Sequence, residues 1–217
     1  MPRLLTVLFS ALLFTSAAQA TASGRGPHAM LATAIERMTQ RIDQERARLK
    51  EDEHYARKVV NEELEGLVDF RRITQLVMGN WFAPSSREQK LKFLEVFRAS
   101  LVNTYASGLT LYEGQKVRVL PAQEGDVKGG RARVRTEIQT ASGKIVPVFF
   151  SLYQSKEGHW LVENVIVNGL NLGSTFRTQF EQSAQQYGGD LDQVIANWSS
   201  EIEVETAEAP AAAAAAQ

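Results

Sequence analysis

The spacing of the apolar residues changes halfway along this chain of 217 residues. Before residue 110 the apolar side chains recur every three or four positions, which is the period of an amphipathic helix. After residue 114 they alternate with polar side chains, which is the period of a half-buried strand. Helices followed by a block of strands indicate an α+β fold with an antiparallel sheet, because parallel strands need a crossover helix between them.

Four helices are predicted in the first half. The first covers about residues 28–50, and a shorter second helix surrounds Val59 and Val60. Asp69 is a suitable N-cap for the third helix, and Gly79 is a suitable end.

The fourth helix begins with a capping box, Ser86 with Gln89 three residues later, and Gly108 is its predicted end. Its apolar arc is wider than one contact surface requires. The arc comprises Phe93, Leu94, Val96, Phe97, Leu101, Val102 and Tyr105.

Four strands are predicted in the second half, joined by short turns that contain glycine. Short turns join antiparallel neighbours, so the strands form one curved meander. Pro147 lacks a backbone N–H and must occupy an edge position or a bulge. The strands span 115–121, 130–140, 144–154 and 159–168.

Two helices follow the last strand. Asn171 caps the first, which starts near Leu172 and ends at Gly188, and a short one covers 191–198. We therefore expect one domain over residues 21–200, with N-terminal helices and a C-terminal helix packed on a four-stranded antiparallel sheet.

The first twenty residues have the features of a cleaved secretory signal peptide. Arg3 is followed by an apolar run from Leu4 to Ala18, and Ala18 and Ala20 form a small-x-small cleavage site. A retained N-terminal anchor is the alternative. The chain has no cysteine, so neither disulfides nor a lipid-modified cysteine is expected. Export to the periplasm of a Gram-negative bacterium fits best.

The opposite end, residues 201–217, contains four glutamates and an alanine run without an amphipathic pattern. We expect a disordered tail. Between the two ends, acidic and basic side chains nearly balance, so composition gives no reason to expect nucleic-acid binding.

Motifs for catalysis and metal binding are missing from the sequence. His28, His54 and His159 have no metal-ligand spacing, and neither HExxH, CxxC nor G-x-S-x-G occurs. We therefore expect no metal, no cofactor and no catalytic residues. An enzyme with an unpaired acid such as Asp69 or Glu163 remains the minority alternative.

The apolar residues around the last strand exceed what sealing a four-stranded sheet requires. Leu170, Leu172, Phe176 and Phe180 form this surplus together with the wide arc of the fourth helix. The surplus favours an apolar cavity between helices and sheet, whereas a plain hydrophobic core is the alternative for any single residue.

An ordered series of short motifs over about residues 29–199 resembles the MlaC family, the toluene-tolerance auxiliary proteins. The series comprises Asp69-Phe70, Val77-Met78-Gly79-x-Trp81, Gln89-x-x-x-Phe93-x-x-x-Phe97, Thr104-Tyr105, Gly158-x-Trp160, Val165-x-Val167-x-Gly169 and Phe176-Arg177-x-Gln179-Phe180. Two positions depart from the family's pattern: Asn164 replaces a usual acid, and Asn171 replaces a usual serine. The second change looks neutral because asparagine also caps helices. The first puts a salt bridge in doubt.

The resemblance implies an NTF2-like body with a deep apolar cavity that holds the acyl chains of a phospholipid. It implies a monomeric periplasmic shuttle that maintains outer-membrane lipid asymmetry, and no cofactor. The implied partners are an outer-membrane lipoprotein–porin complex and an inner-membrane MCE-domain ABC transporter. An NTF2-like enzyme acting on a small apolar substrate and an adaptor that binds a partner's helix remain alternatives.

We expect the lipid-binding residues to come from both halves of the domain. Lys144 or Arg177 is expected at the head group, with low selectivity among head groups. The candidates for the acyl chains are Val77, Trp81, Phe93, Phe97, Leu101, Tyr105, Val148, Phe150, Val165, Val167, Leu170, Leu172, Phe176 and Phe180.

Overall fold

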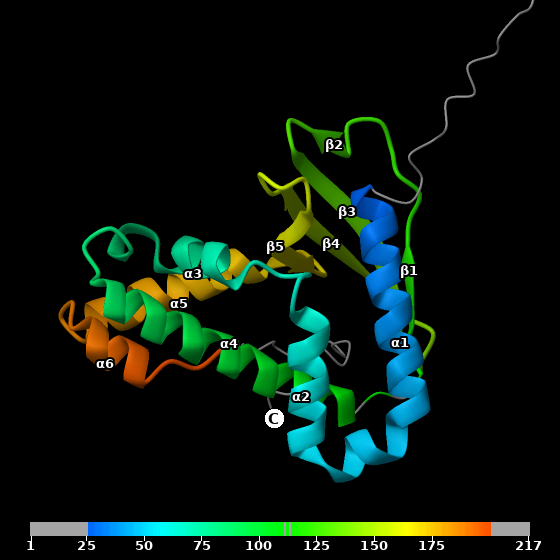
Figure 1. The fold of residues 1–217 in the computed structure, drawn as a ribbon, viewed down its shortest axis with the longest axis horizontal. Coiled ribbons are helices and arrows are strands. Elements are labelled where there is room, and N and C mark those ends of the chain that lie inside the picture. Colours follow the sequence, from blue (N-terminus) through cyan, green and yellow to red (C-terminus); the bar gives the residue numbers. More distant parts are fainter. Residues whose placement is uncertain (1–25, 111, 113, 201–217) are drawn as a thin grey trace, which may run out of the picture.

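The computed structural model describes residues 26–110, 112 and 114–200. The predicted signal peptide (1–20) and tail (201–217) lie outside the described residues. The described chain has the predicted α+β fold, in which helices pack on an antiparallel sheet (Figure 1). None of its helices is long and apolar enough to cross a membrane.

The helices agree with the sequence pattern within a few residues. They are α1 (Pro27–Glu51), α2 (Glu53–Leu64), α3 (Phe70–Met78), the 3₁₀ turn η1 (Gly79–Trp81), α4 (Arg87–Thr110), α5 (Leu172–Gln186) and α6 (Leu191–Ala196).

The predicted caps are present. The Asp69 side chain accepts a hydrogen bond from the backbone N–H of Arg72, and Gly79 ends α3 with a φ of 52°. Ser86 and Gln89 exchange the two hydrogen bonds of a capping box. These ends were predictable because capping depends on neighbouring residues alone.

The end of α4 was predicted wrongly, because the helix continues past Gly108 to Thr110. Gly108 is buried and lies on the wall of a cavity. A glycine inside a helix costs about 1 kcal/mol relative to alanine, and packing of the surrounding turns offsets such a cost.

The sheet has six strands where four were predicted. Its order is β1-β3-β4-β5-β6, with β2 paired to β3, and all pairs are antiparallel. The strands are β1 (Lys116–Val119), β2 (Val127–Lys128), β3 (Arg131–Gln139), β4 (Ile145–Gln154), β5 (Trp160–Val167) and β6 (Leu170–Asn171).

The predicted strand ends at residue 168, whereas the structure continues through a turn into the short strand β6. Asn168 and Gly169 have φ values of 49° and 88° and form a tight hairpin that pairs Val167 with Leu170. Asn-Gly between apolar residues is the strongest short-range hairpin signal. The sequence therefore contained the information.

Pro147 lies just beyond the stretch of β4 that pairs with β5, which begins with Val148 opposite Val167. Its carbonyl accepts a hydrogen bond from the N–H of Asn168, and no ladder bond from its own nitrogen is required there. The irregularity in this ladder falls elsewhere, between Ser151 and Leu152.

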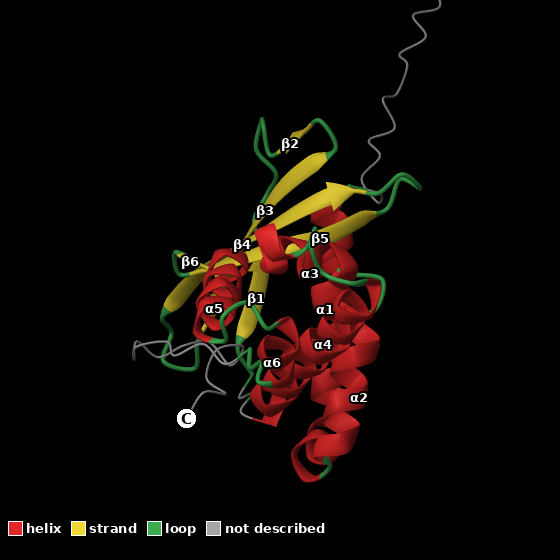
Figure 2. Ribbon diagram, turned by 90° about the vertical axis from the view of Figure 1, so that its left-hand side faces the viewer, coloured by secondary structure: helices red, strands yellow, loops and turns green. Residues whose placement is uncertain are grey.

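The hydrophobic core is divided into three clusters. One joins α3, α4, α5 and α6, a second joins α1, α2 and α4, and a third joins the start of α1 to β3, β4 and β5. Figure 2 shows α1, α2 and α4 together on one side of the sheet. The inner face of the sheet is thus covered by helices that pack mainly on one another, which leaves space between the clusters.

Candidate functional site: an apolar cavity between helices and sheet

A cavity of about 490 Å³ lies between the inner face of the sheet and α1, α2, α4 and α5. Residues of all three core clusters line it, among them Phe97, Val60 and Leu31. Its volume falls within the range of about 300–1,000 Å³ that is typical of ligand pockets.

Alternate residues of the strands form one wall. Thr136 and Ile138 of β3 and Val146, Val148 and Phe150 of β4 line the cavity, because side chains two apart on a strand share one face. Across the cavity, Phe97, Leu101, Tyr105 and Leu109 stand four residues apart on α4. This spacing places all four on one side of the helix.

Ten of the fourteen acyl-chain candidates line the cavity. They are Phe97, Leu101, Tyr105, Val148, Phe150, Val165, Val167, Leu170, Leu172 and Phe176.

The other four, Val77, Trp81, Phe93 and Phe180, do not line the cavity and belong to the cluster between α3 and α6. The rings of Phe93 and Phe180 meet edge to face at 4.8 Å, and Trp198 lies 5.1 Å from Phe93. These side chains fill the space between helices. Phe93 precedes Phe97 by one turn of α4, and both residues belong to the cluster that includes α6, but only Phe97 also lines the cavity.

The sequence prediction missed the contribution of the N-terminal helices. The apolar side of α1 forms a wall through Leu31, Ala34, Ile35, Met38 and Ile42, and α2 adds Val60 and Leu64. The periodicity of α1 identified this side as apolar. It did not reveal whether the side faces other residues or empty space.

The exposure of the lining residues locates the mouth. Only Lys144, Asn168 and Leu170 are exposed among them, and these residues follow or form the β3–β4 and β5–β6 turns. At the other end of the strands, Leu31 and Val162 are almost fully buried. The cavity therefore opens beside these two turns, with Lys144 as the one cation on the described lining.

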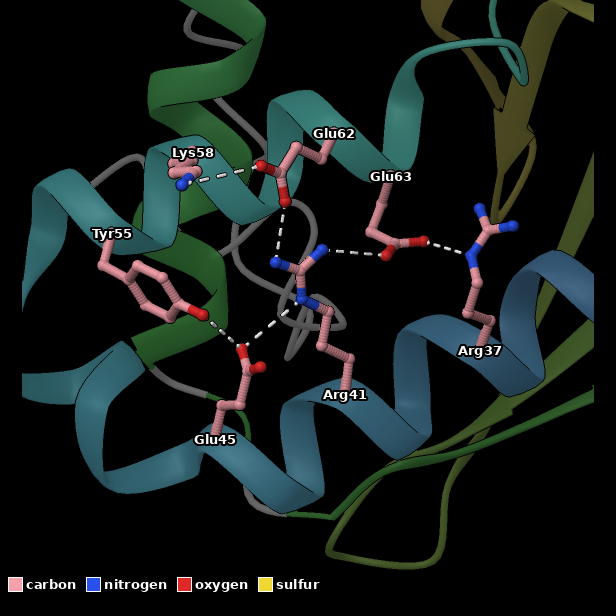
Figure 3. Close-up of polar contacts among 7 residues, drawn as sticks. All are labelled: Arg37, Arg41, Glu45, Tyr55, Lys58, Glu62 and Glu63. Carbon is pink, nitrogen blue, oxygen red and sulfur yellow. Dashed lines mark hydrogen bonds and ion pairs between the residues drawn. The ribbon is translucent and has the colours of Figure 1, made fainter.

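Two buried glutamates border the cavity, and each forms ion pairs with two arginines. Glu63 accepts hydrogen bonds from Arg37 at 2.6 Å and Arg41 at 3.1 Å (Figure 3). Glu163 contacts Arg72 at 2.5 Å and Arg131 at 3.4 Å. Burial of a charge is tolerated when it is paired in this way.

Arg41 ties the two N-terminal helices together. It contacts Glu62 as well as Glu63 on α2, and Glu45 on its own helix (Figure 3). The hydrogen bond to Glu62 is the largest of the interactions that raise the pKa of Arg41 above its usual value. The guanidinium is therefore charged at every pH at which the protein folds.

The second head-group candidate, Arg177, lies outside the cavity lining. Its guanidinium packs on Gly79, where an added Cβ would lie 2.9 Å from Nε. Among the described residues, no group of three or more acidic or histidine side chains could hold a metal ion.

The model of the MlaC protein family matches residues 32–200. The chain belongs to the MlaC family. It is 36% identical over 144 residues to the toluene tolerance protein ttg2D of Pseudomonas putida, a match that covers 66% of each chain. It is 27% identical over 173 residues to the Intermembrane phospholipid transport system binding protein MlaC of Haemophilus influenzae, which covers 78% of each.

A solved structure shares the fold. The phospholipid-binding protein of Ralstonia solanacearum, in complex with a phospholipid, superposes with a TM-score of 0.71 and 23% identity. The superposition covers 78% of this chain and 92% of that protein.

The two departures from the MlaC pattern are partners in the structure. The side-chain NH₂ of Asn164 donates to Oδ1 of Asn171 at 3.0 Å, and Asn164 Oδ1 accepts from the N–H of Gly173 at 3.0 Å. Oδ1 of Asn171 also accepts from the N–H of Ser174, which is the predicted cap of α5. We call this group the Asn164–Asn171 clamp.

Proposed function

We propose that this protein binds a diacyl phospholipid with its acyl chains in the cavity and its head group at the mouth. It carries the lipid across the periplasm between an outer-membrane lipoprotein–porin complex and an inner-membrane MCE-domain ABC transporter. The observation that carries the proposal is an apolar cavity that opens beside the β3–β4 and β5–β6 turns, in a family whose relatives are named for phospholipid binding and transport.

The energetics of lipid in water explain why a carrier is needed. Burial of a methylene contributes about 0.8 kcal/mol, so two acyl chains with roughly 30 methylenes represent about 24 kcal/mol. This value exceeds the practical limit of about 18–21 kcal/mol for noncovalent affinity. Free phospholipid is therefore negligible, and transfer requires a second apolar phase such as this cavity.

The polar groups on the wall support binding and not catalysis. Both glutamates that border the cavity, Glu63 and Glu163, are engaged by two arginines each and are not free to accept a proton from a substrate. The described lining contains no histidine. An enzyme acting on a small apolar substrate would require an acid or base poised beside that substrate, and the two glutamates on this wall are already paired with arginines.

The head group is proposed to lie beside Lys144. This ammonium is exposed at the mouth, where a phosphate can approach it while staying in water. A single exposed cation discriminates weakly among phospholipids that all carry a phosphate, so low head-group selectivity follows.

Native mass spectrometry of the protein purified from a periplasmic extract tests the proposal. We expect a mass excess equal to one or more phospholipids, which organic extraction removes and thin-layer chromatography identifies. A protein that is empty at every step, and that takes up no lipid from vesicles, would rule out the lipid-carrier function. The same spectrum tests the expected start at Thr21 after signal-peptide cleavage.

A further inference from the structure

Two tyrosines line the cavity, and their hydroxyl groups differ in one respect. The Tyr112 hydroxyl donates a hydrogen bond to the backbone carbonyl of Gln115 at 3.1 Å. The Tyr105 hydroxyl makes no hydrogen bond with any other residue in the part of the chain that the structure describes. One cavity hydroxyl is therefore occupied by the protein, and the other is available.

Tyr105 lies between a core cluster and the cavity. The ring packs against the cluster that joins α1, α2 and α4, which includes Val60 and Val102. Burial raises the pKa of Tyr105 above its usual value. The Tyr105 oxygen is nevertheless accessible, unlike the buried polar atoms of the described residues that lack a partner. The Tyr105 side chain is half-buried, and we assign the accessible space beside its oxygen to the cavity that the residue lines.

A free hydroxyl in an apolar cavity requires an acceptor from the ligand. A buried donor without a partner costs about 1–3 kcal/mol, whereas a donor that meets an acceptor contributes about 0.5–1.5 kcal/mol. Hydrocarbon chains offer no acceptor, and the phosphate stays at the mouth beside Lys144. The ester carbonyls of a phospholipid lie between the chains and the phosphate.

The position of Tyr105 along α4 fits that intermediate depth. It lies one turn before Leu109, about 6 Å farther from the mouth end of the helix. Leu101 and Phe97 continue the wall inward. We propose that the Tyr105 hydroxyl donates a hydrogen bond to an ester carbonyl of the bound lipid, so that the cavity discriminates diester from diether phospholipids. This inference rests on the proposed lipid-binding function.

Competition between two lipids that differ only in the carbonyls tests the inference. The purified full chain is incubated with vesicles that contain equal amounts of a diester phosphatidylglycerol and its diether analogue with chains of the same length. Native mass spectrometry then gives the ratio of the two bound lipids. We expect the unmodified protein to favour the diester, and Tyr105→Phe to lower the diester-to-diether ratio about two- to tenfold, the equivalent of one hydrogen bond.

Tyr112→Phe is the matched control, because it removes a cavity hydroxyl that already donates its proton to the backbone carbonyl of Gln115. Its diester-to-diether ratio should equal that of the unmodified protein. Equal ratios in all three proteins, or no preference in the unmodified protein, would overturn the role of Tyr105 while leaving lipid binding intact. Failure of the unmodified protein to take up either lipid would overturn the proposed function itself.

Discussion

The Asn164–Asn171 clamp makes a quantitative prediction for the substitution Asn164→Asp. The carboxylate keeps the hydrogen bond from the N–H of Gly173 but loses the donor that faces Asn171 Oδ1. Two acceptor oxygens then meet at about 3 Å. If the Asn171 amide turns to donate to the carboxylate, its oxygen leaves the N–H of Ser174 and the cap of α5 is lost. One hydrogen bond is lost in either arrangement.

The expected loss of stability is the difference between the cost of a lost hydrogen bond and the gain from a negative charge near the N-terminus of α5. Loss of a cap or of one partly buried hydrogen bond costs about 1–2 kcal/mol. A negative charge near the N-terminus of α5 recovers about 0.3–1 kcal/mol. The net loss is about 1 kcal/mol, which lowers the melting temperature of a chain of this size by about 2–4 °C.

The second substitution, Asn171→Ser, should rescue the first. A serine hydroxyl donates to the carboxylate at position 164 and still accepts from the N–H of Ser174. Asn171→Ser alone should be nearly neutral, because serine and asparagine are comparable caps. The double variant Asn164→Asp/Asn171→Ser should therefore recover the lost stability.

Urea unfolding of the four proteins gives the coupling energy between positions 164 and 171. We expect about 1 kcal/mol, within the range of 0.5–3 kcal/mol for residues in one network. Phospholipid content should follow the same order, because the clamp fixes the corner from which Leu170 and Leu172 reach the cavity. Additive effects within about 0.5 kcal/mol would refute the reasoning.

Further substitutions test the walls of the cavity and the polar contacts near it. Val148→Trp should stay folded and lose most of its co-purified phospholipid. Phe97→Ala should keep lipid and lose about 3–5 kcal/mol of stability. Unfolding of the Val148→Trp variant in a thermal melt would contradict the assignment of Val148 to the cavity wall. Glu63→Gln should cost about 2–3 kcal/mol in urea unfolding, because the buried carboxylate that pairs with Arg37 and Arg41 is lost. The more exposed Glu62→Gln should cost about 1 kcal/mol or less, and equal losses would contradict the burial argument. Burial and the hydrogen bond to the Asp69 carboxylate raise the pKa of Tyr153 to about 12. The protonated hydroxyl therefore contributes fully to stability below pH 10, and this contribution is lost as the pH rises toward 12. Tyr153→Phe should therefore flatten the decline of melting temperature over that interval, and an unchanged decline would assign it to other groups.

Features that depend on neighbouring residues were predictable from the sequence. The caps at Asp69, Ser86 and Asn171 are satisfied by residues two to four positions away, so the sequence contains both partners. The four long strands followed from alternation for the same reason. The hairpin at Asn168-Gly169 was equally local, and its omission was an error of interpretation.

The division between core and cavity was not predictable because it depends on distant elements. Phe93 and Phe97 occupy one side of α4 and have the same periodicity, yet only Phe97 lines the cavity. The difference arises because Phe93 is surrounded by side chains from about a hundred residues later, Phe180 of α5 and Trp198 after α6. Periodicity shows which side of a helix is apolar, whereas the elements that face this side are set by packing between distant parts of the chain.

The cavity links the stability of this fold to its occupancy. Side chains that border unfilled apolar space lose the packing contacts of a filled core, and this lowers the stability of the protein. Acyl chains return this packing energy when they enter, and their departure removes it. Glu63 and Glu163 are buried beside this space, and each is paired with arginines on other elements, so the pairs join the walls of the cavity. A side chain that fills the cavity should thus stabilise the empty protein by the same contacts with which it excludes lipid, and greater stability with less bound lipid is the expected signature of any such variant.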